Sequence, residues 1–128
     1  MIQFEYNKSI QEFTTFGVPV EAEVFCTFSS LSDLTKILVH PSAKGKPQLI
    51  IGGGSNMLFT KNFKGVVLKN EILGKRILQE TEEEVCIQVG AGENWHQFVL
   101  YCVEKNLGGL ENLSLIPGNV GASPMQNI

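Results

Sequence analysis

The sequence has no run of about 18 apolar residues. Its first ten residues, MIQFEYNKSI, lack the basic start and apolar core of a signal peptide. No strongly basic segment is present either, since ten Lys and Arg against thirteen Asp and Glu give a formal net charge of −3. Nucleic-acid binding depends on a basic face. These absences predict a cytoplasmic protein with no membrane segment and no nucleic-acid partner.

Cysteine is scarce, and the three cysteines form no CxxC pair and have no histidine at ligand spacing. Their neighbours are apolar, as in VFCTF and VCIQV. We therefore expect Cys26, Cys86 and Cys102 to be buried free thiols, which suits a reducing compartment. No metal site is predicted.

The first half of the chain indicates alternating strands and one helix. β-Branched and aromatic residues predict a strand at residues 22–28. Ser30 suits a helix N-cap, Asp33 suits the first turn, and Pro41 ends the helix. Its apolar face would consist of Leu31, Leu34, Ile37 and Leu38. Further strands are expected at residues 48–51, 57–60 and 65–70.

The second half indicates a β-hairpin and a second helix. Residues 72–79 and 85–89 would pair across the acidic turn 81–84, which we interpret as a solvated tip. The helix would begin after Asn94 and end at residues 106–109, where glycine suits a left-handed cap. Its apolar face would consist of Trp95, Phe98, Val99, Cys102 and Val103. The pattern predicts an α+β fold with a subdomain boundary near Asn70.

Glycine is in excess, at 13 of 128 residues against a usual level of about 7%. The strand at 48–51 leads directly into GGGSN, residues 52–56. Glycine lets the backbone approach a ligand closely, and successive amides in such a turn can hold an anion. The lysine of a Walker loop is missing, and residues 57–60 do not indicate the helix that a dinucleotide fingerprint requires. A phosphate cradle and a plain glycine turn both remain open.

The last stretch, LIPGNVGASPMQNI, belongs to a segment without charge from Asn112 onward. Pro117 and Pro124 fix φ, while Gly118 and Gly121 permit close backbone approach. Apolar contacts would come from Ile116, Val120 and Met125, and uncharged hydrogen bonds from Asn119 and Ser123. This composition suits a wall against a flat, partly polar ring system. The alternative is a structural loop that packs against a following domain.

Four motifs occur together: Thr15-Phe16-Gly17, GGGSN, GAGENWH at residues 90–96, and GLENLSLIPGNVGASPMQNI. In this order and spacing they resemble the flavin-binding part of the UDP-N-acetylenolpyruvoylglucosamine reductase family of bacterial peptidoglycan synthesis. The resemblance covers nearly the whole chain.

The resemblance implies the FAD-binding fold shared with vanillyl-alcohol oxidase, in which two α+β subdomains clamp an extended FAD. Residues 1–70 would form a βαβ-type first subdomain and residues 71–128 the first part of a truncated second one, with the C-terminal substrate domain absent. The pyrophosphate would bind to Gly52, Gly53, Gly54, Ser55 and Asn56. The flavin and ribityl region would be lined by Ile116, Pro117, Gly118, Val120, Gly121, Ser123, Pro124 and Met125.

In the family, NADPH reduces FAD, the flavin reduces the enolpyruvyl group of a UDP-sugar, and a serine acts as the acid. That serine, with the arginine and glutamate that stabilise the intermediate, follows the segment that this chain resembles. We therefore expect no catalytic residue here, and an inactive fragment of a longer enzyme. Glu93 and His96 have a structural and a catalytic interpretation, and both remain open.

Two other functions fit the sequence. One is the FAD module of another oxidase with the same fold, although the His or Cys that often tethers FAD there is missing from GGGSN and LIPGNVG. The other is a small binding module without catalytic activity.

Overall fold

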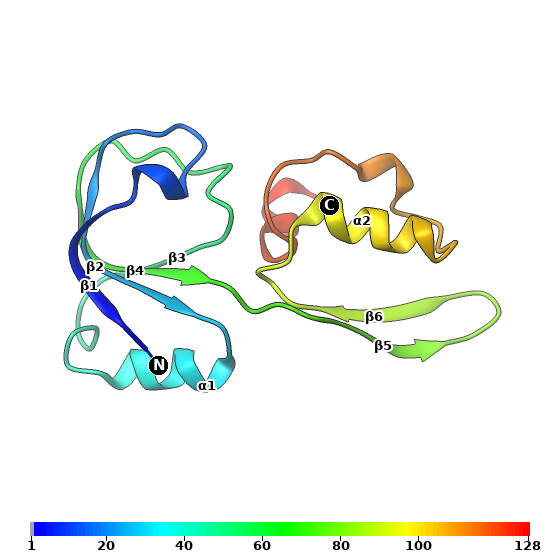
Figure 1. Ribbon diagram of the computed structural model, residues 1–128, viewed down its shortest axis with the longest axis horizontal. Coiled ribbons are helices and arrows are strands. Elements are labelled where there is room, and N and C mark those ends of the chain that lie inside the picture. Colours follow the sequence, from blue (N-terminus) through cyan, green and yellow to red (C-terminus); the bar gives the residue numbers. More distant parts are fainter. Residues whose placement is uncertain (1) are drawn as a thin grey trace. The chain divides into compact units, whose positions relative to one another are not determined.

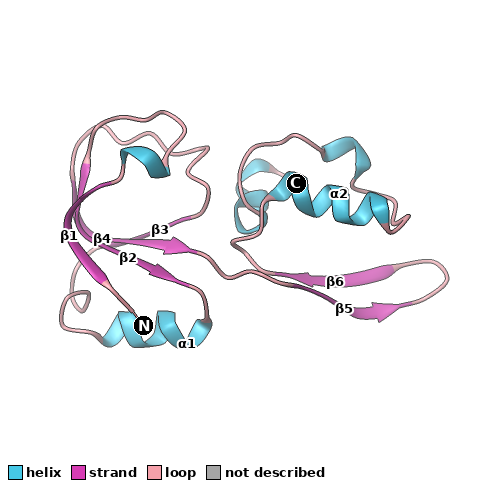
Figure 2. Ribbon diagram, viewed as in Figure 1, coloured by secondary structure: helices cyan, strands magenta, loops and turns pink. Residues whose placement is uncertain are grey.

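The computed structural model describes residues 2–128, which form two compact units (Figure 1, Figure 2). Unit 1 ends at Glu71, and unit 2 runs from Ile72 to Ile128. Each unit has its own hydrophobic core, built from one β-sheet and one α-helix together with the loops around them.

Unit 1 contains a four-stranded sheet with the strand order β1-β2-β4-β3. β1 is antiparallel to β2, whereas β2, β4 and β3 are parallel to one another. The strands are β1 Phe4–Ser9, β2 Glu21–Phe28, β3 Gln48–Ile51 and β4 Phe63–Asn70. The sequence predicts the last three but not β1, because its segment FEYNKS is an edge strand with few buried side chains.

The two central strands are buried on both faces. Val24, Phe25 and Cys26 of β2 and Val66, Val67 and Leu68 of β4 are all almost inaccessible to solvent. A parallel centre covered on both sides gives continuous apolar runs in the sequence. Helix α1 (Leu31–Val39) packs beside β2, and a cluster that includes Ile10, Phe25 and Ile51 is covered by loops.

Helix α1 begins as predicted, with Ser30 Oγ accepting a hydrogen bond from the Asp33 amide at 3.0 Å. Its predicted apolar face is only partly correct, because Ile37 is buried whereas Leu31 and Leu38 are exposed. Of the nine residues of this helix only Ile37, in the last turn, is buried, and its neighbours Leu38 and Val39 are exposed.

The strand predicted at residues 57–60 is wrong. β3 and β4 are parallel neighbours, and residues 52–62 connect them without a helix. Met57 and Phe59 pack against the unit 1 core while Leu58 and Thr60 are exposed. The segment therefore has the alternation of a strand, although it crosses between strands and pairs with neither.

Unit 2 begins with a hairpin of β5 (Lys75–Glu80) and β6 (Val85–Val89). Thr81 closes its tip, since its Oγ1 accepts hydrogen bonds from the amides of Glu83 and Glu84. Helix α2 (Trp95–Glu104) follows, and then two short 3₁₀ helices, Glu111–Leu113 and Val120–Gln126.

Helix α2 is capped by Asn94, whose side chain accepts a hydrogen bond from the Gln97 amide at 3.0 Å. Trp95, Phe98, Val99 and Cys102 are buried as predicted, but Val103 is 46% exposed. The left-handed cap is also different from the prediction. Asn106 adopts it with φ +57°, and the next amide, of Leu107, donates to the Cys102 carbonyl at 2.8 Å.

The expectation of three buried thiols holds for Cys26 and Cys102 and is wrong for Cys86, which is exposed. In β6, Cys86 and Gln88 point away from the core while Val85, Ile87 and Val89 are partly buried. Among the described residues, no helix has the length and apolar character needed to cross a membrane.

We expect two valines of α2 to respond differently to truncation. Val99 is 1% exposed and Val103 is 46% exposed. Val99→Ala should lower the free energy of unfolding by about 2 kcal/mol, and Val103→Ala by less than about 0.5 kcal/mol. The measurement is urea unfolding followed by the fluorescence of Trp95, the single tryptophan. Equal losses would contradict the orientation of α2.

Candidate functional site

The first predicted segment, residues 52–56, directly follows the carboxyl end of β3. It consists of a bend and then a turn. Gly54 is buried and has φ +66°, a conformation that side chains with a Cβ rarely adopt. Gly53 and Asn56, on either side of it, are exposed. The segment is therefore anchored at its centre and open to solvent on both sides of that anchor.

Gly54 is required by packing against another part of unit 1. A Cβ at this position would lie 1.9 Å from the Phe13 carbonyl oxygen and 2.9 Å from Thr14 Cα. The Thr15 amide also donates a hydrogen bond to the Gly54 carbonyl at 3.2 Å. The structure thus brings the start of the Thr15-Phe16-Gly17 motif against GGGSN, a contact that the sequence analysis does not predict.

The donor groups of this segment fit an anion. None of the hydrogen bonds found among the described residues is donated by the amides of Gly53 or Asn56. No residue from 47 to 60 is charged. Lys69 lies near the base of the loop, with its Nζ 5.8 Å from the centre of the Phe13 ring. Lys69 is itself paired with the Glu71 carboxylate at 3.9 Å, so the feature that suits a phosphate group here is a pair of unbonded amides in an uncharged stretch.

The second predicted segment, residues 116–125, is bonded to the GAGE part of the GAGENWH motif. The amides of Val120 and Gly121 donate to the carbonyls of Glu93 and Ala91, at 2.8 and 3.0 Å. The Asn119 side chain donates to the Gly92 carbonyl at 3.0 Å. Two motifs separated in the sequence therefore form one local structure in unit 2.

Two glycines of this segment have a structural explanation. Gly118 has φ +115°, and its carbonyl accepts a hydrogen bond from the Trp95 amide at 3.0 Å. A Cβ on Gly121 would lie 2.7 Å from the Ala91 Cβ. Close packing against Ala91 thus already disfavours a side chain at 121, as packing against Phe13 does at 54.

The apolar side chains of the second segment divide into two groups. Ile116 and Val120 pack against the cluster around Trp95 and contribute to the unit 2 core. Met125 is 80% exposed, and Pro117 and Pro124 are exposed as well. The second group is exposed, whereas Ile116 and Val120 are only partly accessible.

The Glu93 side chain is hydrogen-bonded to the first residue of strand β5 and to the residue before it. Its carboxylate accepts hydrogen bonds from Lys75 Nζ at 2.7 Å and from the Gly74 amide at 2.8 Å. The hydrogen bond from Lys75, followed by that from Gly74, lowers the pKa of Glu93 below its ordinary value. A carboxylate held ionised in an ion pair is a structural anchor, which favours the structural interpretation.

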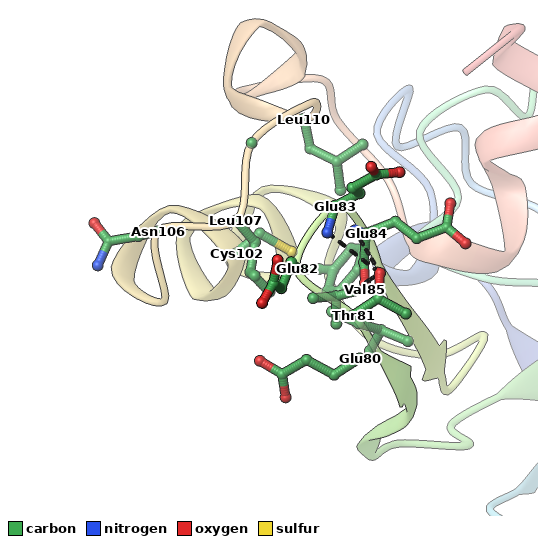
Figure 3. Close-up of a pocket in the computed structure, with 13 residues that line it drawn as sticks. Glu80, Thr81, Glu82, Glu83, Glu84, Val85, Cys102, Asn106, Leu107 and Leu110 are labelled. Carbon is green, nitrogen blue, oxygen red and sulfur yellow. Dashed lines mark hydrogen bonds between the residues drawn. The ribbon is translucent and has the colours of Figure 1, made fainter.

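One pocket in unit 2 does not involve the predicted residues. A pocket of about 580 Å³ lies between the hairpin tip and α2, and Figure 3 shows the side chains that line it. Its floor includes Phe98, Leu107 and Leu110, and its rim includes the glutamates 80, 82, 83 and 84. Four carboxylates without a lysine or arginine among the lining residues disfavour an anionic ligand.

A second pocket of about 580 Å³ lies in unit 1 and is lined by Pro47 and residues 58–64. It follows the glycine segment directly in the sequence and includes Lys61 and Lys64. The sequence predicts no ligand for these residues, and three of them lie in the strand wrongly predicted at residues 57–60. The sequence signal that could have indicated this pocket is the pair of lysines, Lys61 and Lys64, on either side of Asn62 and Phe63.

Comparison with known proteins provides the family. A family model described as "FAD binding domain" matches residues 22–128. The chain belongs to this FAD binding domain family.

Curated relatives have one name. The UDP-N-acetylenolpyruvoylglucosamine reductase of Chromobacterium violaceum is 44% identical over 127 residues, and that of Flavobacterium johnsoniae is 42% identical over 127 residues. Each alignment covers 99% of this chain and 37% of the relative. The chain thus spans 37% of the length of these relatives.

A solved structure is similar in fold. It is the crystal structure of the reductase of the same name from Thermus caldophilus, with a TM-score of 0.66 and 23% identity. The match covers 96% of this chain and 41% of that one. The resemblance predicted from the motifs, the α+β FAD-binding fold and FAD as the cofactor of this FAD binding domain family are confirmed.

The packing at Gly54 can be tested with alanine substitutions. Gly45→Ala is the matched control, because Gly45 has φ +77° but no atom within 4 Å of a new Cβ. It should cost about 1 kcal/mol for the left-handed backbone alone. Gly54→Ala should cost about 4 kcal/mol or more, since the backbone of Phe13 must move. Urea unfolding followed by circular dichroism measures both, and similar losses would contradict the close approach.

The Glu93 ion pair predicts a pH-dependent stability. Because the folded-state pKa is lowered, the pair stabilises the fold above the unfolded-state pKa of about 4.3, and this contribution is lost as pH falls through the folded value. At pH 7, Glu93→Gln should lower the free energy of unfolding by about 1.5–3 kcal/mol.

The difference between wild type and Glu93→Gln should shrink as the pH falls below about 4.3. Glu82→Gln at the exposed hairpin tip is the control, with little change expected at any pH. A difference that is constant with pH would show that the ionised carboxylate of Glu93 is not responsible.

Proposed function

We propose that this chain binds FAD through two segments, one in each unit. The diphosphate-binding group would consist of Gly52, Gly53, Gly54, Ser55 and Asn56. The flavin and ribityl group would consist of Ile116, Pro117, Gly118, Val120, Gly121, Ser123, Pro124 and Met125. Membership of the FAD binding domain family is the observation that carries the proposal.

The first segment is supported by its donors and by its rigidity. A diphosphate needs accessible N–H groups that are not already bonded. Gly53 and Asn56 are exposed residues, and their amides donate none of the hydrogen bonds found among the described residues. The contact of Gly54 with Phe13 fixes the turn before any ligand arrives. A preorganised loop loses little conformational entropy on binding.

The second segment is supported by its surface. Pro117, Pro124 and Met125 present exposed apolar atoms on a backbone that is bonded to residues 91–93. A flavin ring requires an apolar face together with hydrogen bonds at its edge. Ile116 and Val120 would act indirectly here, because they hold the segment against the core of unit 2.

The relatives' name suggests the activity of the longer protein. This chain would supply the FAD-binding part of a reductase that uses NADPH and a UDP-N-acetylglucosamine enolpyruvate in peptidoglycan synthesis. Unit 1 would be the first FAD-binding subdomain and unit 2 the first part of the second. The free cysteines suit a protein of the cytoplasm.

FAD titration followed by quenching of flavin fluorescence tests the cofactor site. The variant is Asn56→Asp, which places a carboxylate in the proposed diphosphate site and should weaken binding about tenfold. The control is Asn112→Asp, which makes the same charge change at an exposed residue outside both segments. Equal effects of the two variants would contradict the assignment of residues 52–56.

The reductase proposal needs a protein of the relatives' full length. We suggest a chimera in which this chain replaces the matching segment of the Chromobacterium violaceum relative. The chimera should retain FAD and oxidise NADPH in the presence of the enolpyruvyl sugar, whereas the 128-residue chain alone should bind FAD without oxidising NADPH. If neither protein binds FAD, the proposed function is wrong; flavin that stays attached after denaturation would instead favour an oxidase with tethered FAD.

A further inference from the structure

His96, the second residue of α2, forms a hydrogen bond that its position in the sequence does not predict. Its Nδ1 accepts a hydrogen bond from the Leu115 amide at 3.2 Å. Leu115 directly precedes the second FAD-binding segment. The imidazole therefore contacts the backbone at the point where that segment begins.

Leu115 has an unusual backbone conformation. Among the described residues, four that are not glycine have positive φ, and three of them are Asn7, Asn106 and Asn127. Asparagine tolerates this region because of its short polar side chain, whereas leucine does not. Leu115 has φ +63°, and its side chain is 76% exposed, so side-chain packing does not hold it in place.

Neighbouring contacts show what the His96 bond adds. Trp95 Nε1 donates to the Leu113 carbonyl at 2.7 Å, and the Trp95 amide donates to the Gly118 carbonyl at 3.0 Å. The bond between His96 and Leu115 lies between these two in the sequence. The first turn of α2 thus holds the segment from 113 to 118 at three successive points.

We propose that His96 is a positioning residue for FAD, and that it acts only with a neutral imidazole. The proposal rests on the assignment of residues 116–125 to the flavin. The hydrogen bond holds Leu115 in its left-handed conformation and so fixes the direction in which residues 116–118 leave it. Without this bond, Leu115 returns to an ordinary conformation and the flavin wall is displaced.

The dependence on the neutral form follows from imidazole chemistry. Nδ1 accepts the Leu115 amide only through its lone pair, so the ring proton is on Nε2. An imidazolium has N–H donors at both nitrogens and no acceptor. Protonation therefore breaks the bond and places an N–H opposite the Leu115 amide.

The charged groups near His96 do not oppose this change. No residue from 112 to 128 carries a charged side chain. On the side of α2, Glu93 is paired with Lys75, and before the segment Glu111 accepts a hydrogen bond from the Gly109 amide. None of the ion pairs or hydrogen bonds found among the described residues joins His96 to a carboxylate.

Two substitutions separate the acceptor from the titration. His96→Asn places the amide Oδ1 close to the position of Nδ1 and cannot take up a proton near neutral pH. His96→Ala removes the acceptor. At pH 7.5, His96→Ala should bind FAD about three- to tenfold more weakly than wild type, the range for one neutral hydrogen bond. His96→Asn should bind FAD with nearly wild-type affinity.

A second experiment compares the pH dependence of FAD affinity in variants of the two histidines of the chain. Between pH 7.5 and pH 5.5, wild type should lose three- to tenfold in FAD affinity and His96→Asn should not, because only the imidazole can gain a proton in this range. His40 in unit 1 is the matched control, because its Nδ1 also accepts a backbone N–H, from Ser42 at 3.2 Å. His40→Asn should keep the wild-type pH dependence.

A readout without FAD distinguishes failure of this inference from failure of the proposed function. The readout is the protection factor of the Leu115 amide, which is its hydrogen exchange rate by NMR corrected for the intrinsic slowing of exchange at lower pH; in wild type it should fall between pH 7.5 and pH 5.5. In His96→Asn the amide should stay protected. If Leu115 exchange depends on pH in this way but neither wild type nor any variant binds FAD, the proposed function is wrong. The hydrogen bond between His96 and Leu115 would still be supported.

If FAD binds equally well to wild type, His96→Ala and His96→Asn, the positioning role is overturned. The same conclusion follows if Leu115 exchange is the same in His96→Ala and wild type. A loss of affinity in His96→Asn as large as in His96→Ala would also contradict the role of the acceptor.

Discussion

Close approach of one backbone to another is the constraint on which both candidate segments depend. At Gly54 the chain passes the carbonyl of Phe13, and at Gly121 it passes Ala91, each within a distance that excludes a Cβ. Main-chain hydrogen bonds accompany both contacts. The segments are therefore shaped by the protein itself. A ligand that binds them would meet a surface already in place, which limits the entropy lost on association.

Local patterns in the sequence were sufficient for most elements but not for those defined by distant contacts. The caps at Ser30 and Asn94 and the buried face of α2 follow from local chemistry. Residues 57–60 alternate like a strand only because Met57 and Phe59 reach the core from a crossing loop. The edge strand β1 has no apolar run that would indicate a strand in the sequence. It is a strand because it pairs with β2.

The candidate residues were chosen from the sequence as a set, and their binding of FAD stays a prediction. Clustered glycines and the motif order were sufficient to select residues 52–56 and 116–125. The sequence analysis explained the glycines by ligand approach, whereas close packing of neighbouring residues already disfavours a side chain at Gly54 and Gly121. The contacts of Thr15 with Gly54 and of His96 with Leu115 join residues far apart in the sequence, and no periodicity encodes such pairs.

Charge gives the two segments a common physical character. The protein has a net charge of −3, so a diphosphate is repelled by most of its surface. The two longest stretches without a charged residue are 47–60 and 112–128, and they contain all thirteen candidate residues. The pocket of about 580 Å³ rimmed by glutamates in Figure 3 has the opposite character. An anionic cofactor would therefore bind at these stretches because they have no carboxylate side chains and offer backbone N–H donors. The volume of a cavity would not decide the place.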